Sequence, residues 1–248
     1  MAFMTAIAPY CHVIPDYSKS IPPLVVQPIF MDMPERAREA YVSMARKYKA
    51  EGVEAVSAAV KMGKLQQICA GALYSEDEVI ELHTMKIDWL KKITRDKKDT
   101  HLIVYQYDFE AERLEEAFPD LVIMPSKSSE VDETVKSWND GQIRLLGIHS
   151  RSAGHGLNLQ KGGHSIIWLS PQWSNDAFEQ VNARLHRRGQ TQPVTACLLL
   201  MKDTIEDLVI VPRLEHKQEI MPAFLAHLNS IDTGARDEPA RDRKAYPH

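Results

Sequence analysis

The fold of this chain is decided by the stretch IRLLGIHSRSAGHGLNL, residues 143–159. Its first six residues are mostly apolar and predict a buried β-strand. The strand enters a loop that contains Gly154 and Gly156. Because glycine has no Cβ, such a loop can bring backbone N–H groups close to a phosphate or a sugar. The same pattern is also typical of a tight strand-to-helix turn, so both interpretations stay open at this point.

Strand and helix patterns alternate on both sides of this stretch. Further short apolar runs predict strands at LIVYQ 102–106, LVIM 121–124, IIWL 166–169 and VTACLLL 194–200. Between them, apolar residues at i, i+4 and i+7 predict helices. Apolar strands separated by helices indicate a parallel sheet that is covered on both faces. We therefore predict an α/β domain over residues 99–228, RecA-like or Rossmann-like, with right-handed crossovers.

The remaining segments differ in pattern. Residues 1–34 are rich in proline, and LVVQPIFM, residues 24–31, predicts a strand that Pro28 restricts to a sheet edge. Residues 35–98 read as an α-helical linker region. Its helices are expected from Glu35, over Val53–Ile68 and over Ile87–Ile93. Residues 229–248 are polar and charged without apolar periodicity, which predicts a disordered tail.

A second segment, QVNARLHRRGQ at residues 180–190, contains three arginines and one histidine but no acid. We place it on the helix that follows residues 166–169, where Arg184 and Arg187 would share one face at i, i+3. Gly189 stands where a glycine would end that helix. Two guanidinium groups side by side suit the oxygens of a polyphosphate. The alternative is a solvated basic helix end that complements the helix dipole.

Composition narrows the function classes. The net charge is −4, so any nucleic-acid binding must depend on a local basic patch. Three widely spaced cysteines argue against a disulfide framework and against a cysteine-rich metal site. No apolar run is long enough to cross a bilayer, and no secretory signal is evident. We expect a cytoplasmic protein that does not bind membranes, in a bacterium or a phage-infected host cell.

Together, the two segments resemble motifs V and VI in the second RecA-like lobe of superfamily-two helicases, specifically the Snf-type DNA translocases. LIVYQYDFEAERL, from residue 102, resembles motif IV, and TQPVTACLLLMKDTIED, from residue 191, resembles the strand and helix that follow motif VI. MPERAREAY and KLQQICAG resemble the helical region that links the two lobes. The resemblance covers residues 22–208 and implies a RecA-like parallel sheet. Ser170-Pro-Gln-Trp173 resembles bacterial and phage-like variants of the family.

In this family ATP lies between two lobes, and the second lobe supplies arginine fingers. The resemblance implies that Arg187 meets the γ-phosphate and that Arg184 lies in the same cleft. Gln180 and the backbone of Gly154 and Gly156 would border the nucleotide. One departure is Ala183, which stands where the family commonly has Asp before the first arginine.

The resemblance also implies contacts with the nucleic-acid backbone. It assigns them to Ser150 and Arg151 at the start of motif V, to Tyr107 near motif IV, and to Trp173. Contacts with phosphate and sugar would position the protein without reading base sequence.

The phosphate loop of the first lobe is missing from these residues. No G-x-x-x-x-G-K-[ST] occurs, and Gly63-Lys64 is followed by Leu65. The acidic run at residues 76–78 is interpreted as a solvated loop rather than a metal-binding motif, because the pattern predicts no apolar strand before it. ATP and Mg²⁺ are therefore expected only in a complex with a first lobe.

Our main hypothesis is half of a split motor. A separate chain with the phosphate-loop lobe would complete it, DNA would be its nucleic acid with RNA as the alternative, and the chain alone would not hydrolyse ATP. A second hypothesis is a non-enzymatic nucleic-acid-binding or regulatory module with the same fold. A third is that the 248 residues are a fragment of a longer protein.

Overall fold

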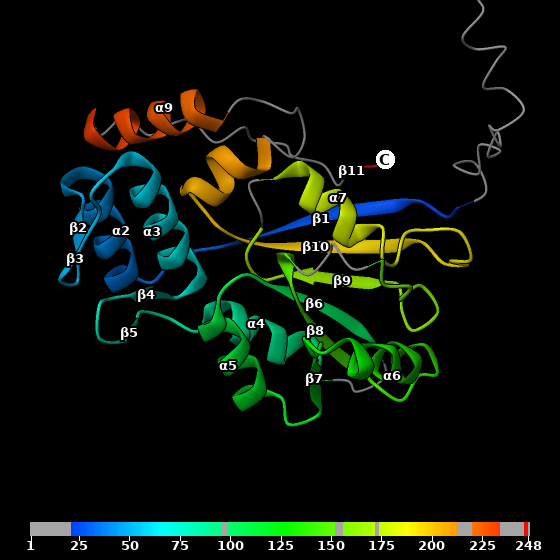
Figure 1. The fold of residues 1–248 in the computed structure, drawn as a ribbon. Helices are drawn as coiled ribbons and strands as arrows, with labels where there is room; N and C mark the ends of the chain where they lie inside the picture. The colour runs from blue at the N-terminus through cyan, green and yellow to red at the C-terminus, as the bar shows by residue number, and fades with distance from the viewer. Residues whose placement is uncertain are drawn as a thin grey trace, which may run out of the picture.

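The computed structural model describes residues 21–95, 99–151, 156–171, 174–212, 220–233 and 246–247. A seven-stranded sheet forms its centre (Figure 1). In spatial order its strands are β11 (Tyr246–Pro247), β1 (Leu24–Met31), β10 (Val194–Met201), β9 (Ser165–Trp168), β6 (His101–Tyr105), β8 (Leu145–His149) and β7 (Leu121–Ile123). Only β11 is antiparallel to its neighbour, so the predicted parallel sheet is confirmed.

Helices cover both faces of this sheet. In β6, Leu102 and Val104 point to the face covered by α6 (Ser128–Asn139) and α7 (Asn175–Asn182), whereas Ile103 points to the opposite face. That second face is covered by α4 (Met85–Ile93) and α5 (Asp108–Ala117). Because the strands are buried on both sides, they read as continuous apolar runs rather than as alternating ones. The predicted three-layer architecture is therefore observed.

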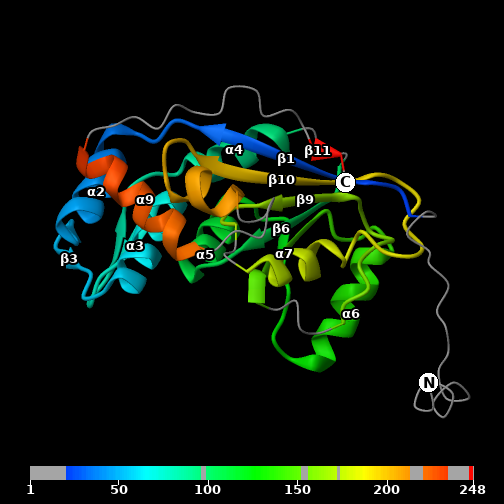
Figure 2. The same cartoon turned by 90° about the horizontal axis from the view of Figure 1, so that it is seen from above.

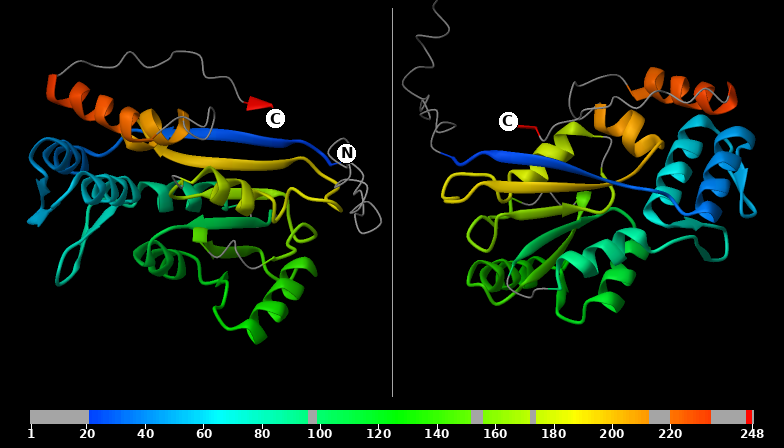
Figure 3. Two further views of the ribbon diagram at one scale, coloured as in Figure 1. Left: turned by 45° about the horizontal axis from the view of Figure 1, so that its top comes forward. Right: turned by 180° about the vertical axis from the view of Figure 1, so that it is seen from behind.

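The helical region packs against one end of the sheet, where β1 leads into α2 (Glu35–Lys47) (Figure 1). Helix α3 (Ala58–Ala70) lies beside α2, and α9 (Ile220–Thr233) crosses over them (Figure 2). A π-helix, η4 (Glu206–Ile210), connects this group to the end of β10. Figure 3 shows the same arrangement from two further sides. No helix in the described ranges is both long and apolar enough to cross a membrane.

Residues 35–98 contain the helices α2, α3 and α4, but the prediction that the region is entirely helical was wrong. Two hairpins interrupt it, β2 (Lys49–Ala50) with β3 (Val53–Glu54), and β4 (Ala72–Tyr74) with β5 (Val79–Glu81). Val53 lies in a strand, and α3 begins only at Ala58. The reason is local, since Ser57 caps the helix by accepting a hydrogen bond from Val60 N at 3.2 Å.

The acidic run at residues 76–78 is a solvated loop, as predicted, but the expectation that no apolar strand precedes it was wrong. It follows an apolar strand, β4, and forms the exposed turn of the hairpin. Ser75 Oγ accepts hydrogen bonds from the backbone N–H groups of Asp77 and Glu78, which shapes this turn. Among the described residues, no cluster of His, Cys, Asp and Glu could hold a metal ion.

The ends of the domain extend beyond the predicted boundaries. Strand β1 pairs with β10 along its whole length, from Leu24 opposite Val194 to Met31 opposite Met201. The boundary predicted after residue 34 therefore follows a strand of the central sheet. Pro28 lies near the sheet edge as expected, because β11 pairs only with Val25 and Val26. The boundary predicted at residue 228 falls inside α9.

Candidate functional site

The two segments that the sequence singled out touch each other. The backbone N–H of Leu159 donates to Arg184 O at 3.2 Å. The side-chain amide of Gln190, which is buried, donates to Gln160 O at 3.1 Å and to Gly163 O at 3.0 Å. The end of the segment resembling motif V is therefore held against the segment resembling motif VI, although some 25 residues separate them in sequence.

Arg184 and Arg187 do not lie on a helix face, contrary to the sequence prediction. Helix α7 ends at Asn182, and the chain continues in tight turns with bonds from Arg184 N to Val181 O and from Arg187 N to Leu185 O. Gly189 has the positive φ that its position predicted, +94°, but it does not end this helix. The two arginines thus lie on an irregular segment after α7. The buried side chain of Gln190 anchors the end of that segment through its hydrogen bonds to Gln160 O and Gly163 O.

The surroundings of this pair are electropositive. Among the described residues, neither Arg184 nor Arg187 forms an ion pair with a carboxylate. Burial lowers the pKa of Arg184, and the nearby guanidinium of Arg187 lowers it further. Within the same described set, Arg184 Nε is buried without a hydrogen-bond partner. A half-buried pair of cations without a counter-charge is suited to hold an anion.

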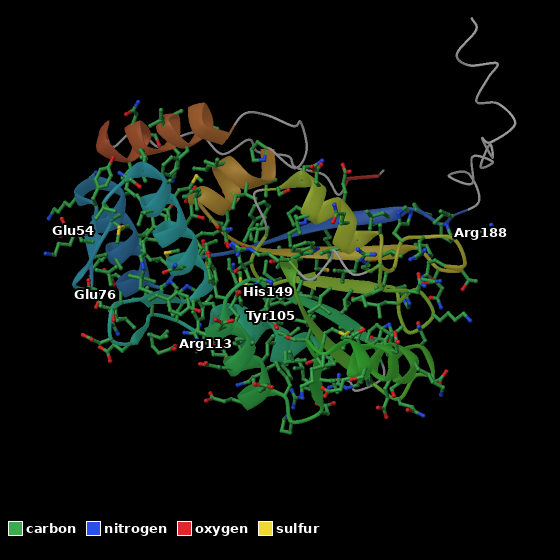
Figure 4. The ribbon with its side chains drawn as sticks, in the orientation of Figure 1. Glu54, Glu76, Tyr105, Arg113, His149 and Arg188 are labelled. Carbon is green, nitrogen blue, oxygen red and sulfur yellow. The ribbon has the colours of Figure 1, made fainter. Side chains whose placement is uncertain are left out.

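This basic segment lies at the end of the sheet where the parallel strands begin. His186 Nε2 is 2.9 Å from Pro22 O, just ahead of β1, and Figure 4 labels Arg188 at that end. Gln180 is exposed on α7. Gly156 is also exposed, and a Cβ added there would meet nothing within 4 Å, so the chain itself does not require glycine at this position.

The candidate nucleic-acid residues lie at the other end of the sheet, where β6 and β8 finish. Tyr107 is half-buried and stacks on Phe109, with ring centroids 5.2 Å apart. Arg151 is exposed, as a contact with a nucleic acid would require. Ser150 is fully buried, so its side chain does not reach the surface in this structure. Gly154 and Trp173, the other two candidates, lie outside the described residues.

Three residues that were not among the candidate site residues, His149, Gln106 and Glu110, organise this second group. His149 Nε2 lies 3.0 Å from Gln106 O, and His149 Nδ1 accepts a hydrogen bond from Arg151 N at 3.0 Å. Glu110 accepts hydrogen bonds from the backbone N–H groups of Gln106 and Tyr107. The one available signal was the position of Glu110, three residues after the N-cap residue Tyr107 of α5, where glutamate commonly caps a helix.

A cavity of about 610 Å³ opens beside these loops, between β8, α6 and the residues after Gly156. The rings of Tyr105 and His149 meet edge to face on one side of it, and Figure 4 shows both at the middle of the molecule. Asp108 and Asp132 also line this cavity. The arginine pair does not line it, so the two candidate sites are separate surfaces of one lobe.

Comparison with known proteins supports the family suggested by the motifs. The chain is 33% identical over 212 residues to "Putative protein p41" of Acyrthosiphon pisum secondary endosymbiont phage 1, a match that covers 79% of this chain and 44% of that protein. It is 31% identical over 94 residues to "Helicase-like transcription factor CHR28" of Arabidopsis thaliana, covering 38% of this chain and 10% of that protein. The chain therefore spans less than half the length of these curated relatives.

Further matches point the same way. "DNA repair protein rad8" of Schizosaccharomyces pombe is 35% identical over 72 residues, which are 29% of this chain and 6% of that protein. Among solved structures, the C-terminal part of the Fun30 ATPase domain aligns with a TM-score of 0.60 at 15% identity, covering 86% of this chain and 99% of that one. No family model matches the sequence. The structural likeness shows the RecA-like fold. The relatives with helicase or DNA-repair names fit the C-terminal lobe of a Snf-type helicase.

Proposed function

Because this chain belongs to the Snf-type helicases as a C-terminal RecA-like lobe, we propose that it supplies the arginines of an ATP site that another lobe completes. Arg187 would contact the γ-phosphate, with Arg184 beside it. The observation that carries this proposal is the half-buried pair itself, which has no carboxylate partner among the described residues. Charge develops on the phosphoryl oxygens in the transition state, where fixed guanidinium groups stabilise it.

The first lobe has to come from outside these 248 residues, because they contain no phosphate-loop motif. A separate chain is the source that we propose. ATP and Mg²⁺ would be held mainly by that lobe, since phosphate-loop amides and a Mg²⁺-binding acid are the parts that this chain lacks. In the complex, Gln180, which is exposed on α7 four residues before Arg184, would border the nucleotide. The resemblance assigns the same role to the backbone at Gly156, which is exposed but lines the cavity beside Tyr105 and His149.

The opposite end of the sheet is proposed to contact DNA. Arg151 is exposed directly after β8, and the loops after β6 and β9 lie on neighbouring strands. Since the protein carries a net charge of −4, such contacts would depend on a few local cations. They would be directed to phosphate and sugar and would therefore place the DNA without reading its sequence.

The test combines the purified chain with purified first lobes that carry the phosphate loop, and measures ATP hydrolysis with and without double-stranded DNA. Arg187→Ala is expected to lower the rate by about 10³–10⁵-fold, the effect of losing an arginine finger. Arg188→Ala is the matched control, because Arg188 is the exposed neighbour. Activity that survives Arg187→Ala would contradict the proposal. DNA binding by the chain, with no hydrolysis in any pairing, would favour the non-enzymatic module instead.

A further inference from the structure

A row of polar side chains, most of them buried, crosses the end of the sheet where the strands finish and links neighbouring strand ends through hydrogen bonds to side chains and backbone. It starts at β10, where the backbone N–H of Met201 donates to Glu206 Oε2 at 2.9 Å. The other carboxylate oxygen of Glu206 binds Lys86 Nζ at 2.6 Å. Lys86 also donates to Leu169 O, just after β9, at 2.6 Å. Lys86 therefore joins the ends of β10 and β9.

The row continues from β9 to β6 through Glu110. Ser170 Oγ donates to Glu110 Oε1 at 2.8 Å. The second oxygen of Glu110 accepts hydrogen bonds from Gln106 N at 2.9 Å and Tyr107 N at 3.1 Å. One carboxylate thus holds two loops that are about 60 residues apart in sequence.

His149 extends the row from β6 to β8. Since His149 Nδ1 accepts from Arg151 N, the ring proton resides on Nε2 and is donated to Gln106 O. The spatial strand order here is β10, β9, β6, β8, so four neighbouring strand ends are connected in turn. A side branch comes from α3, where the buried amide of Gln66 donates to Pro171 O at 2.7 Å.

These contacts hold the loops that follow the strands, rather than the strands themselves. The strands are already held by their own backbone ladders, whereas the bonds of Glu110, Gln66 and Lys86 end on residues 106–107 and 169–171. Burying charged side chains is costly unless their partners repay the cost. Lys86 and Glu110 are each only 2% exposed, and Glu206 is fully buried. Such an arrangement fixes backbone atoms in one geometry, which favours a role in positioning.

We propose that Glu110 is a positioning residue which, with Lys86 and Gln66, holds the loops after β6 and β9 in the arrangement that receives the nucleic-acid backbone. The helical region, which contributes Lys86 and Gln66, is then part of the nucleic-acid site rather than a spacer between lobes. That these loops receive nucleic acid rests on the proposed function. The positioning itself rests only on the contacts above.

The experiment compares four variants of the full chain. Glu110→Ala removes every bond of the carboxylate, and Ser170→Ala removes only the link from β9. Glu110→Gln is the rescue variant, because its oxygen can accept from both backbone N–H groups while its amide donates to Ser170 Oγ. Glu112→Ala is the control, since Glu112 is exposed on the same helix. Amide hydrogen exchange at residues 106 and 107 is measured by NMR, and affinity for a DNA duplex by fluorescence anisotropy.

We expect faster exchange at both amides and roughly 10–100-fold weaker DNA binding for Glu110→Ala, because small displacements of contacting groups are costly. Ser170→Ala should show a smaller loss in DNA affinity. Glu110→Gln and Glu112→Ala should keep wild-type behaviour. If Glu110→Ala does not fold, Ser170→Ala carries the test alone.

Two results would overturn the inference. Unchanged exchange in both Glu110→Ala and Ser170→Ala would show that the row does not position the loop. Faster exchange with unchanged DNA affinity would show that the position does not serve nucleic-acid binding. If the unmodified chain binds no DNA, the nucleic-acid part of the proposed function fails, and the exchange rates alone decide whether Glu110 positions the loop.

Discussion

Lys86 and Glu206 form an ion pair of 2.6 Å inside the protein, where their side chains are 3% and 0% exposed. They lie 120 residues apart in sequence and join α4 to η4. Burial raises the pKa of Glu206, and the ammonium group of Lys86 acts against that rise. Each buried charge is therefore compensated only while the other partner is present.

The first prediction concerns this ion pair. Lys86→Met should lower the free energy of unfolding by about 3–5 kcal/mol, because it leaves a buried carboxylate without its cation. Lys86→Met combined with Glu206→Gln should recover much of that loss, since the amide oxygen can still accept from Met201 N. Urea unfolding measures both. Lys91→Met on the exposed side of α4 is the control and should stay within about 0.5 kcal/mol of wild type. An equal loss in Lys86→Met and Lys91→Met would refute the prediction.

The second prediction concerns pH and His83. This residue is 9% exposed, and burial together with the nearby Lys86 ammonium lowers its pKa to about 4. The unfolded chain therefore binds a proton at His83 more readily than the folded chain. The stability that this residue contributes is complete above about pH 6.5 and is lost as pH falls toward 4. The full effect is on the order of 3 kcal/mol.

Unfolding by urea at pH 7 and pH 5 tests this dependence. His83→Gln keeps an N–H donor for Ile68 O but cannot titrate. The stability difference between pH 7 and pH 5 should therefore be smaller in His83→Gln than in the wild-type chain. A variant with the same pH dependence as wild type would assign the effect to other groups.

The third prediction compares two glycines, Gly63 inside α3 and Gly71 at its C-terminal cap. Gly63 lies inside the helix with no neighbour within 4 Å of an added Cβ, so Gly63→Ala should stabilise the protein by about 0.5–1 kcal/mol. Gly71 has φ +107°, and a Cβ there would lie 2.3 Å from His83 O. Gly71→Ala should be destabilising by more than about 1 kcal/mol. Thermal unfolding of the two single variants checks the opposite signs.

The fourth prediction concerns the proposed contact of Arg151 with DNA. Arg151→Ala should weaken DNA binding to a similar extent for every sequence, because phosphate contacts carry no sequence information. The slope of log affinity against log salt should become shallower by about one. Fluorescence anisotropy between low and moderate salt measures both. Lys47→Ala on α2 is the control, since Lys47 is exposed outside these loops. An unchanged slope in Arg151→Ala would exclude a phosphate contact.

The sequence determined the central architecture by itself. Strands that are covered on both faces are mostly apolar, so β6, β8, β9 and β10 were each visible as short apolar runs. The edge strand β7, which is half-buried, showed the same pattern. The family was also readable, because the segments at 150–159 and 180–190 carry side chains that few folds combine. Both signals are local, and local patterns are what a sequence displays directly.

The tertiary structure alone decided how the functional segments are presented. Helix α7 ends before Arg184 and Arg187, and contacts with distant residues hold the chain at this point. Leu159 N takes the carbonyl of Arg184, and Trp168 Nε1 binds the side chain of Asn182 at 3.1 Å. The row from Glu206 to His149 likewise joins residues up to 120 positions apart. Pairings over such distances depend on which strands become neighbours, and no periodicity along the chain encodes that order.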